Sequence, residues 1–253
     1  MDTKYSRRYR LASCFLCFAT GIFLLLHVCC LDACAESTIP EQAKIAKEQR
    51  DAGDKLRATA KNLRTFHWND TTGIPDFVAA DELPSETAKK SAKLEDQAFD
   101  FLNEHKTLFK LKDARKEFKI ARKTVGPTGF QHLRLEQMYA GLPVFGAGLV
   151  VHSDASGSVR AVNGAFLPGI DLDIKPSLTP EETSAIAFPN LDYSSALLEP
   201  PILGVFDPRS VNQSGIPTLA YDFRLSVDRY LVDAHTGAIL FKYSTTTGLG
   251  VLT

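Results

Sequence analysis

The stretch that decides the fold is LRLEQMYAGLPVFGAGLVVH, residues 133–152. Leu133, Leu135 and Tyr139 alternate with polar residues, which is the period of a strand with one buried face. The apolar run at 144–151 predicts the next strand. Flanking strands are expected around 118–120 and 158–163. A glycine-containing loop at 153–157 is expected to connect the strand at 144–151 with the strand at 158–163. This region therefore predicts an antiparallel sheet.

Upstream of this sheet, the sequence predicts a hairpin and a helix. Residues 63–68 and 74–78 are rich in aromatic and β-branched side chains, and the Asn-Asp-Thr-Thr-Gly segment at 69–73 has turn chemistry. A helix is expected from Ser85, as its N-cap, to Leu108, with its apolar residues on one face. A helix followed by an antiparallel sheet is an α+β arrangement.

Downstream, a second unit opens with a helix-start signal. Thr179 has N-cap character, Pro180 fits the first helical position, and Glu182 completes a capping box. The helix is expected to end near residues 188–189. Strands are then predicted at about 202–206, 218–227, 229–233 and 238–243. The predicted fold class is α+β, with two consecutive helix-plus-antiparallel-sheet units after a signal peptide.

The first 35 residues have the layout of a secretory signal peptide. A basic head is followed by an apolar run at 11–31, and small residues at positions 33 and 35 predict cleavage between Ala35 and Glu36. Two alternatives stay open. The apolar run is long enough for an uncleaved membrane anchor, and Cys34 lies in a segment similar to a lipoprotein signal. All three interpretations place the remainder outside the cytoplasm, so we expect a secreted or periplasmic protein.

Cysteine usage and charge restrict the chemistry further. All five cysteines lie within the leader, so cleavage leaves no disulfide, thiolate metal site or cysteine nucleophile. The whole chain has a formal net charge of −1. Removal of the leader takes four basic and two acidic residues and leaves 25 basic against 28 acidic. Neither the net charge of the whole chain nor that of the cleaved chain indicates a nucleic-acid partner.

No catalytic constellation can be identified in the sequence. Zinc proteases need two histidines one helical turn apart with a glutamate between them, and the chain has no H-E-x-x-H. Its histidines after the leader are isolated from one another: His67, His105, His132, His152 and His235. G-x-S-x-G and phosphate-binding loops are missing too. We therefore predict no catalytic residue, no metal site and no cofactor in this chain.

The segment 133–152 resembles the fungalysin/thermolysin propeptide (FTP) domain. That pattern runs Q-x-Y-x-G, an apolar residue, P-V-(F/Y)-G, an apolar strand, a turn and a strand ending in N-G. The matching residues are Gln137, Tyr139, Gly141, Pro143, Val144, Phe145, Gly146, Gly157, Asn163 and Gly164. We expect most of them to be structural, while contact with a protease stays open.

The second unit is similar to a PepSY domain, with Asp233 and Gly237 in its matching turn. The end of the chain, Thr247 to Leu252, resembles the start of the mature protease in this family. The expected organisation is a signal peptide at 1–35, a polar helical or disordered arm at 36–63, an FTP-like domain at 64–172, a PepSY-like domain at 173–245, and a protease-like tail at 246–253.

The resemblance implies a pro-region that acts by binding. Such pro-regions act as intramolecular chaperones and inhibitors of a zinc metalloprotease, so the implied partner is a thermolysin-type catalytic domain, in cis or in trans. Zinc is then expected only in that catalytic domain. The alternatives are a free-standing secreted or periplasmic inhibitor or binding module, and a regulator anchored through the leader or a lipidated Cys34.

Overall fold

A computed structural model describes residues 38–88, 93–191 and 199–244. Contacts divide the chain into two units, Met1–Lys44 and Ile45–Thr253. The first helix begins in the first unit, and all side-chain contacts described below belong to the second. The predicted signal peptide with its Ala35–Glu36 cleavage site lies outside the described residues, as does the predicted tail. The helices that are described include none both long and apolar enough to cross a membrane.

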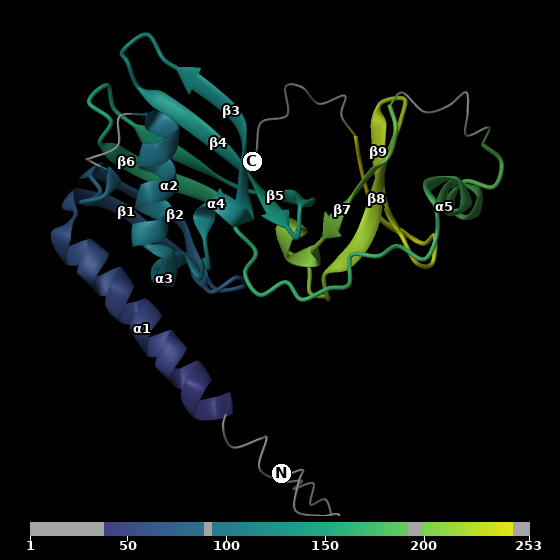
Figure 1. The fold of residues 1–253 in the computed structure, drawn as a ribbon, viewed down its shortest axis with the longest axis horizontal. Helices are drawn as coiled ribbons and strands as arrows, with labels where there is room; N and C mark the ends of the chain where they lie inside the picture. The colour runs from purple at the N-terminus through teal and green to yellow at the C-terminus, as the bar shows by residue number, and fades with distance from the viewer. Residues whose placement is uncertain (1–37, 89–92, 192–198, 245–253) are drawn as a thin grey trace, which may run out of the picture. The chain divides into compact units, whose positions relative to one another are not determined.

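The described elements include both helices and mostly antiparallel strands, which confirms the predicted α+β class (Figure 1). The helices are α1 (Thr38–Thr59), α2 (Leu94–Glu104), α3 (Lys106–Phe109), α4 (Ala114–Glu117), α5 (Pro180–Ala187) and the 3-10 helix η2 (Pro208–Val211). The strands are β1 (Lys61–Asn69), β2 (Ile74–Glu82), β3 (Phe118–Val125), β4 (Gln131–Tyr139), β5 (Leu142–Ser153), β6 (Val159–Ala165), β7 (Ile202–Phe206), β8 (Thr218–Leu225), β9 (Asp228–Asp233) and β10 (Ile239–Ser244).

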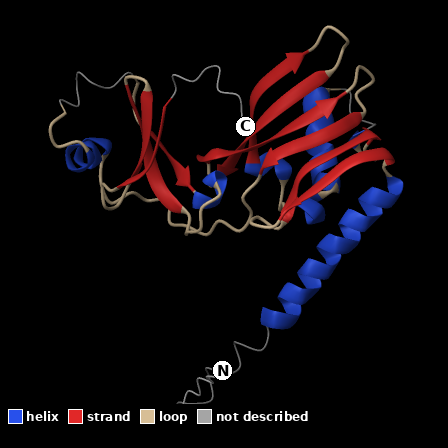
Figure 2. Cartoon of the chain, turned by 180° about the vertical axis from the view of Figure 1, so that it is seen from behind, coloured by secondary structure: helices blue, strands red, loops and turns tan. Residues whose placement is uncertain are grey.

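The first sheet has the order β1-β2-β6-β5-β4-β3, and all of its neighbouring strands are antiparallel. Helix α2 contacts β4 and β6, and α3 contacts β2. Both helices lie on one face of the sheet; from behind, the strands lie in front of α2 (Figure 2). The predicted strands and the β1–β2 hairpin are therefore confirmed.

The core of this region lies between the sheet and its helices. Phe101 and Phe109 come from the helical side, and Leu133, Leu149 and Val151 come from the strands. These side chains are at most 1% exposed. Burial of such a side chain contributes about 1.5–3 kcal/mol, so the alternating strand pattern directly produces the packing that holds the sheet and helices together.

The helix predicted from Ser85 to Leu108 starts later than expected. Helix α2 begins at Leu94, and Ser85 instead caps a separate turn, where its Oγ accepts the N–H of Ala88 at 3.1 Å. The Ser85 hydroxyl also donates to Glu104 at 2.7 Å. Ser85 thus has the expected capping chemistry, but on a local turn tied to the far end of α2.

The arm expected at 36–63 is helical in α1, and its second half is firmly packed. Leu56 is 1% exposed and belongs to the core. The buried Gln49 amide donates to the carbonyls of Gly73 and Leu108 at 2.7 and 2.9 Å. The arm is therefore anchored in spite of its polar composition, because a buried polar residue makes two of its contacts with the rest of the fold.

The second sheet is the antiparallel meander β7-β8-β9-β10. Its helix α5 has the predicted capping box: Thr179 Oγ1 accepts the Glu182 N–H, and Glu182 accepts the Thr179 N–H. Phe223 and Val232 are fully buried in its core. The predicted helix-plus-meander is confirmed, whereas the domain boundary at 172–173 stays a prediction.

Candidate functional site: the seam between the two sheets

Strand β5 takes part in both sheets. It pairs with β4 at Leu142 and Pro143, and the next pair with β4 is Glu136 with Gly148. Val144, in the interval, pairs in parallel with Val205 of β7. The term seam is used below for residues 143–147 of β5 together with β7, η2 and the linker 166–172. The FTP-like motif is therefore where the chain crosses from one sheet to the other.

Glycines make the crossing sterically possible. Gly146 has φ +77° and lies where β5 leaves β4, while Gly141 has φ +86° in the β4–β5 turn. Residues with a Cβ rarely adopt this left-handed region. Gly164 has φ +134°, and a Cβ there would meet the Gly148 carbonyl of the neighbouring strand. These motif positions thus have backbone requirements that explain glycine.

Two motif side chains bind the linker between the sheets. Gln137 is 3% exposed, and its amide donates to the Leu167 carbonyl at 2.9 Å and accepts the Leu167 N–H at 2.8 Å. The Tyr139 hydroxyl makes the same pair of contacts with Leu172, at 3.1 and 3.0 Å. Each side chain therefore pairs with the linker backbone much as a neighbouring strand would.

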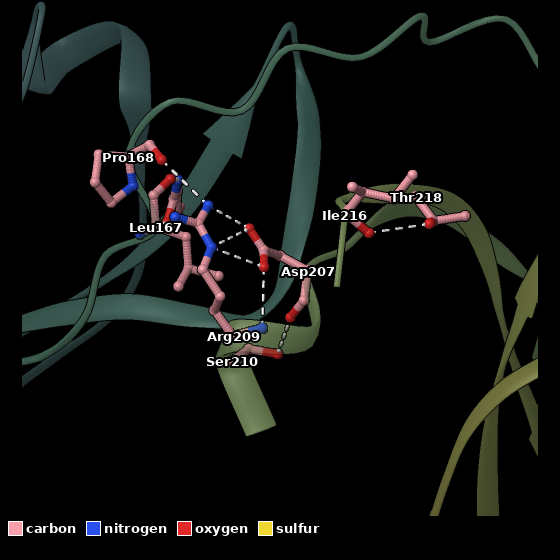
Figure 3. Close-up of polar contacts among 8 residues, drawn as sticks. Leu167, Pro168, Asp207, Arg209, Ser210, Ile216 and Thr218 are labelled. Carbon is pink, nitrogen blue, oxygen red and sulfur yellow. Dashed lines mark hydrogen bonds and ion pairs between the residues drawn. The ribbon is translucent and has the colours of Figure 1, made fainter. Parts of the chain in front are cut away.

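A buried ion pair fixes the other side of the seam (Figure 3). Asp207 is fully buried between β7 and η2, and Arg209 Nε lies 3.0 and 3.1 Å from its two oxygens. Arg209 Nη2 donates to Asp207 at 2.6 Å and to the Pro168 carbonyl at 3.1 Å. Because several donors surround the carboxylate, the charge is buried with its hydrogen-bonding needs met.

Apolar contacts complete the seam. Val144, Ala147, Leu167 and Val205 form a buried cluster. Gly204 of β7 lies against Phe145 and the Pro143 carbonyl, so a Cβ at Gly204 would meet both. Five of the predicted motif side chains and glycines, namely Gln137, Tyr139, Pro143, Phe145 and Gly146, are thus brought together here.

The remaining motif residues lie elsewhere. Asn163 lies in β6, on the face of the first sheet away from α2, and its Oδ1 accepts from His152 Nε2 at 2.6 Å. Asp233 closes the β9–β10 turn by accepting the N–H groups of His235 and Thr236, while Gly237 has φ +74°. Protease contact by any motif residue stays a prediction.

A histidine pair on the same face as Asn163 was not predicted. His132 Nδ1 lies 2.6 Å from His152 Nδ1. Because Asn163 Oδ1 only accepts, His152 Nε2 carries a proton, and its Nδ1 accepts from His132. Burial lowers the pKa of His152, the bond to Asn163 opposes this, and the charge of protonated His132 lowers it further. The geometry thus favours a neutral His152.

The described residues contain no cluster of three or more histidine, cysteine, aspartate or glutamate side chains placed to hold a metal.

The ion pair between Asp207 and Arg209 was not predicted from the sequence either. A local signal was present, because an aspartate followed by proline after an apolar strand is a helix-start pattern. The seam as a whole therefore has a structural chemistry, because its polar side chains bind backbone groups of the linker.

Residues 116–166 match the model described as the Fungalysin/Thermolysin Propeptide Motif. The chain is 37% identical over 125 residues to a bacillolysin from Bacillus cereus, which covers 48% of this chain and 21% of the relative. It is 27% identical over 202 residues to thermolysin from Alicyclobacillus acidocaldarius subsp. acidocaldarius, covering 74% of this chain and 35% of the relative.

The chain therefore spans only 21% and 35% of the length of these two curated relatives. Among solved structures, the Bacillus megaterium YpeB C-terminal domain matches with a TM-score of 0.36 and 17% sequence identity, covering 68% of this chain and 72% of that chain.

The matched interval contains β3, β4, β5 and β6 and runs into the start of the linker. It includes the residues that leave the first sheet at the seam. This chain carries a thermolysin-type propeptide motif, and the matched residues form the four adjacent strands β6-β5-β4-β3 of its first sheet.

Proposed function

We propose that this chain is the pro-region of a thermolysin-type metalloprotease and acts by binding the catalytic domain, as its folding chaperone and its inhibitor. The observation that carries the proposal is the propeptide motif at 116–166, together with relatives that are bacillolysins and thermolysins. In this role the chain performs no catalysis of its own, and zinc belongs to the protease.

A pro-region assists folding by binding the native enzyme in preference to unfolded forms, which stabilises the native state by mass action. The interaction is stronger when the binding surface is already ordered before contact. The partnered groups of the seam, Gln137, Tyr139 and the Asp207–Arg209 pair, hold the strands in place without a partner, which supports a surface that is ordered before contact.

Finer parts of the proposal concern the second sheet and the location. We propose that the helix-plus-meander after residue 173 is a PepSY-like unit and that the chain is exported before it acts. The capping box at Thr179 and the β7–β10 meander are compatible with that unit. Export agrees with the leader and with relatives that are proteases of this class.

The test is a refolding experiment with a mature relative. Mature bacillolysin of Bacillus cereus is unfolded in denaturant and diluted with an equimolar amount of this chain lacking residues 1–35, or with albumin as the control. The expected result is a higher yield of folded protease with the chain, together with a reduced initial rate of peptide hydrolysis before the chain is degraded. Equal yields and equal initial rates in both arms would overturn the proposal. Inhibition without a higher yield would replace it with a free-standing inhibitor.

A further inference from the structure

The open face of the first sheet, defined as the side away from α2 and α3, carries one row of side chains across five strands. In register, these are Phe77 of β2, Asn163 of β6, Val150 of β5, Arg134 of β4 and Arg122 of β3. The row changes from apolar near β2 to cationic at β3. Helices α2, α3 and α4 pack against this sheet from the opposite side, while η2 borders the open face only at the end where Phe77 and Asn163 lie. The open face therefore presents side chains that the fold does not use for its core.

The apolar part of the open face includes two unusually exposed aromatic residues. Phe77 and Phe130 are each 41% exposed. They line a groove of about 430 Å³ together with Ala79, Ala161 and the His132–His152 pair. Exposed aromatic residues beside a shallow groove are typical of surfaces that bind another protein.

The cationic part contains a local conflict. Arg122 and Arg134 lie directly opposite each other on neighbouring strands, and both are exposed. Like charges in this position destabilise a sheet. Within the described part of the chain, neither arginine has an ion-pair partner, whereas the adjacent Lys123 lies 2.9 Å from Glu95. The fold thus supplies a carboxylate to the neighbouring lysine but none to either arginine.

A conflict of this kind, without compensation inside the fold, is expected where a surface is adapted to a partner. Arginine and aromatic residues are also the side chains most often dominant in protein interfaces. The charge missing opposite Arg122 and Arg134 identifies the chemistry of the partner, which must present carboxylates beside an apolar patch.

We propose that the open face is the surface by which this chain binds the protease catalytic domain, with Phe77 at its apolar centre and the Arg122–Arg134 pair bound to carboxylates of the protease. This inference rests on the proposed function. A competing explanation is a solvated edge strand whose charges only prevent aggregation, and that explanation predicts no effect on binding.

The experiment measures the inhibition constant against mature Bacillus cereus bacillolysin from initial rates. The test variant is Arg122→Gln with Arg134→Gln, and the control is Arg50→Gln with Lys116→Gln, which removes the same charge from exposed helical positions. We expect the test variant to raise the inhibition constant at least about tenfold and to weaken its salt dependence, with the control near the unsubstituted value. Thermal unfolding should show the test variant to be no less stable, so that misfolding cannot explain the loss.

A second pair of variants tests the apolar centre. Phe77→Thr preserves strand propensity and removes the ring, and Ile216→Thr removes a side chain that is 80% exposed in a loop. The inhibition constant should rise about tenfold for the first and stay unchanged for the second. Unchanged inhibition by both the arginine and Phe77 variants would overturn the open face as the binding surface while leaving the proposed function standing. An unsubstituted chain that neither binds nor inhibits the protease would overturn both.

Discussion

The seam and the open face use polar residues in opposite ways. At the seam, Gln137 and Asp207 are buried and partnered: Gln137 binds the backbone of Leu167, and Asp207 binds Arg209, which also reaches the Pro168 carbonyl. On the open face, by contrast, Arg122 and Arg134 are exposed, lie opposite a like charge and lack an ion-pair partner among the described residues. The two regions are linked by the same pair of strands, β4 and β5.

This contrast separates residues whose identity the fold explains from residues whose identity it does not explain. Gln137, Tyr139 and Gly146 have structural requirements at the seam that account for their identity without any partner. The arginine pair has no such account, because the fold would be more stable without one of the charges. Substitutions should therefore separate into those that lower stability and those that lower binding.

The largest expected effect is at the seam ion pair. Asp207→Ala should lower the free energy of unfolding by about 3–5 kcal/mol, because it leaves the Arg209 guanidinium without its carboxylate. Urea unfolding measures the loss. The matched control, Asp51→Ala, removes an exposed pair with Lys47 and should cost about 0.3–0.5 kcal/mol. Similar losses for the two variants would show that the seam pair is not special.

The linker contact comes next. Gln137→Leu should lower the free energy of unfolding by about 2–4 kcal/mol, because the buried N–H and carbonyl of Leu167 both lose their partner. Gln213→Leu, at an exposed position, is the control for the same chemical change. A loss at Gln137 no greater than at Gln213 would contradict the role assigned to this amide.

Acidification should weaken the first sheet and its helices. Burial lowers the pKa of His105 and of His152 below the usual 6.5, although bonds to Pro84 and Asn163 oppose the shift. As the pH falls below about 6.5, the unfolded chain takes up these protons before the folded chain, so the free energy of unfolding falls. Unfolding measured between about pH 7 and about pH 5 should show this loss, and His105→Asn and His152→Asn should each make it shallower.

Glu104 should cause a second loss of folding stability, at lower pH than the histidines. Bonds from Ser85, Thr87 and Glu86 overcome desolvation and hold its pKa at about 2. Its contribution is therefore present above about pH 4.5 and is lost as the pH approaches 2. If the free energy of unfolding stays constant between about pH 7 and about pH 5 and falls only at lower pH, protonation of the two histidines is not coupled to folding.

The smallest effect has the opposite sign. Arg122→Gln should raise the free energy of unfolding by about 0.2–1 kcal/mol, because it removes the repulsion from Arg134. The adjacent substitution Lys123→Gln should lower it slightly, because it removes the contact with Glu95. Thermal unfolding of both variants is the measurement. Destabilisation by Arg122→Gln would show that the pair is not in conflict.

Features specified by neighbouring residues were predictable from the sequence. The capping box at Thr179 depends on positions three residues apart, and the β1–β2 hairpin depends on its own turn. The α+β class follows from the same local periods. The helix start predicted at Ser85 was wrong, because a capping residue can cap an isolated turn as well as a helix.

Features that depend on register or on distant segments were not predictable. A regular hairpin in which Tyr139 faces Leu142 would continue to place His132 opposite Leu149. The irregularity between Glu136 and Met138 instead places His132 opposite His152, which creates the histidine pair. The contact of Arg209 with the Pro168 carbonyl depends on how β7 meets β5, and no local pattern determines that meeting.

The central claim, that this chain binds a thermolysin-type protease as its pro-region, is tested most directly by calorimetry. The chain lacking residues 1–35 is titrated into mature Bacillus cereus bacillolysin at low temperature. We expect saturable one-to-one binding with a dissociation constant below about 1 μM, equivalent to a binding free energy of about 8 kcal/mol in favour of the complex. No saturable heat at protein concentrations well above that value, with both proteins folded, would contradict it.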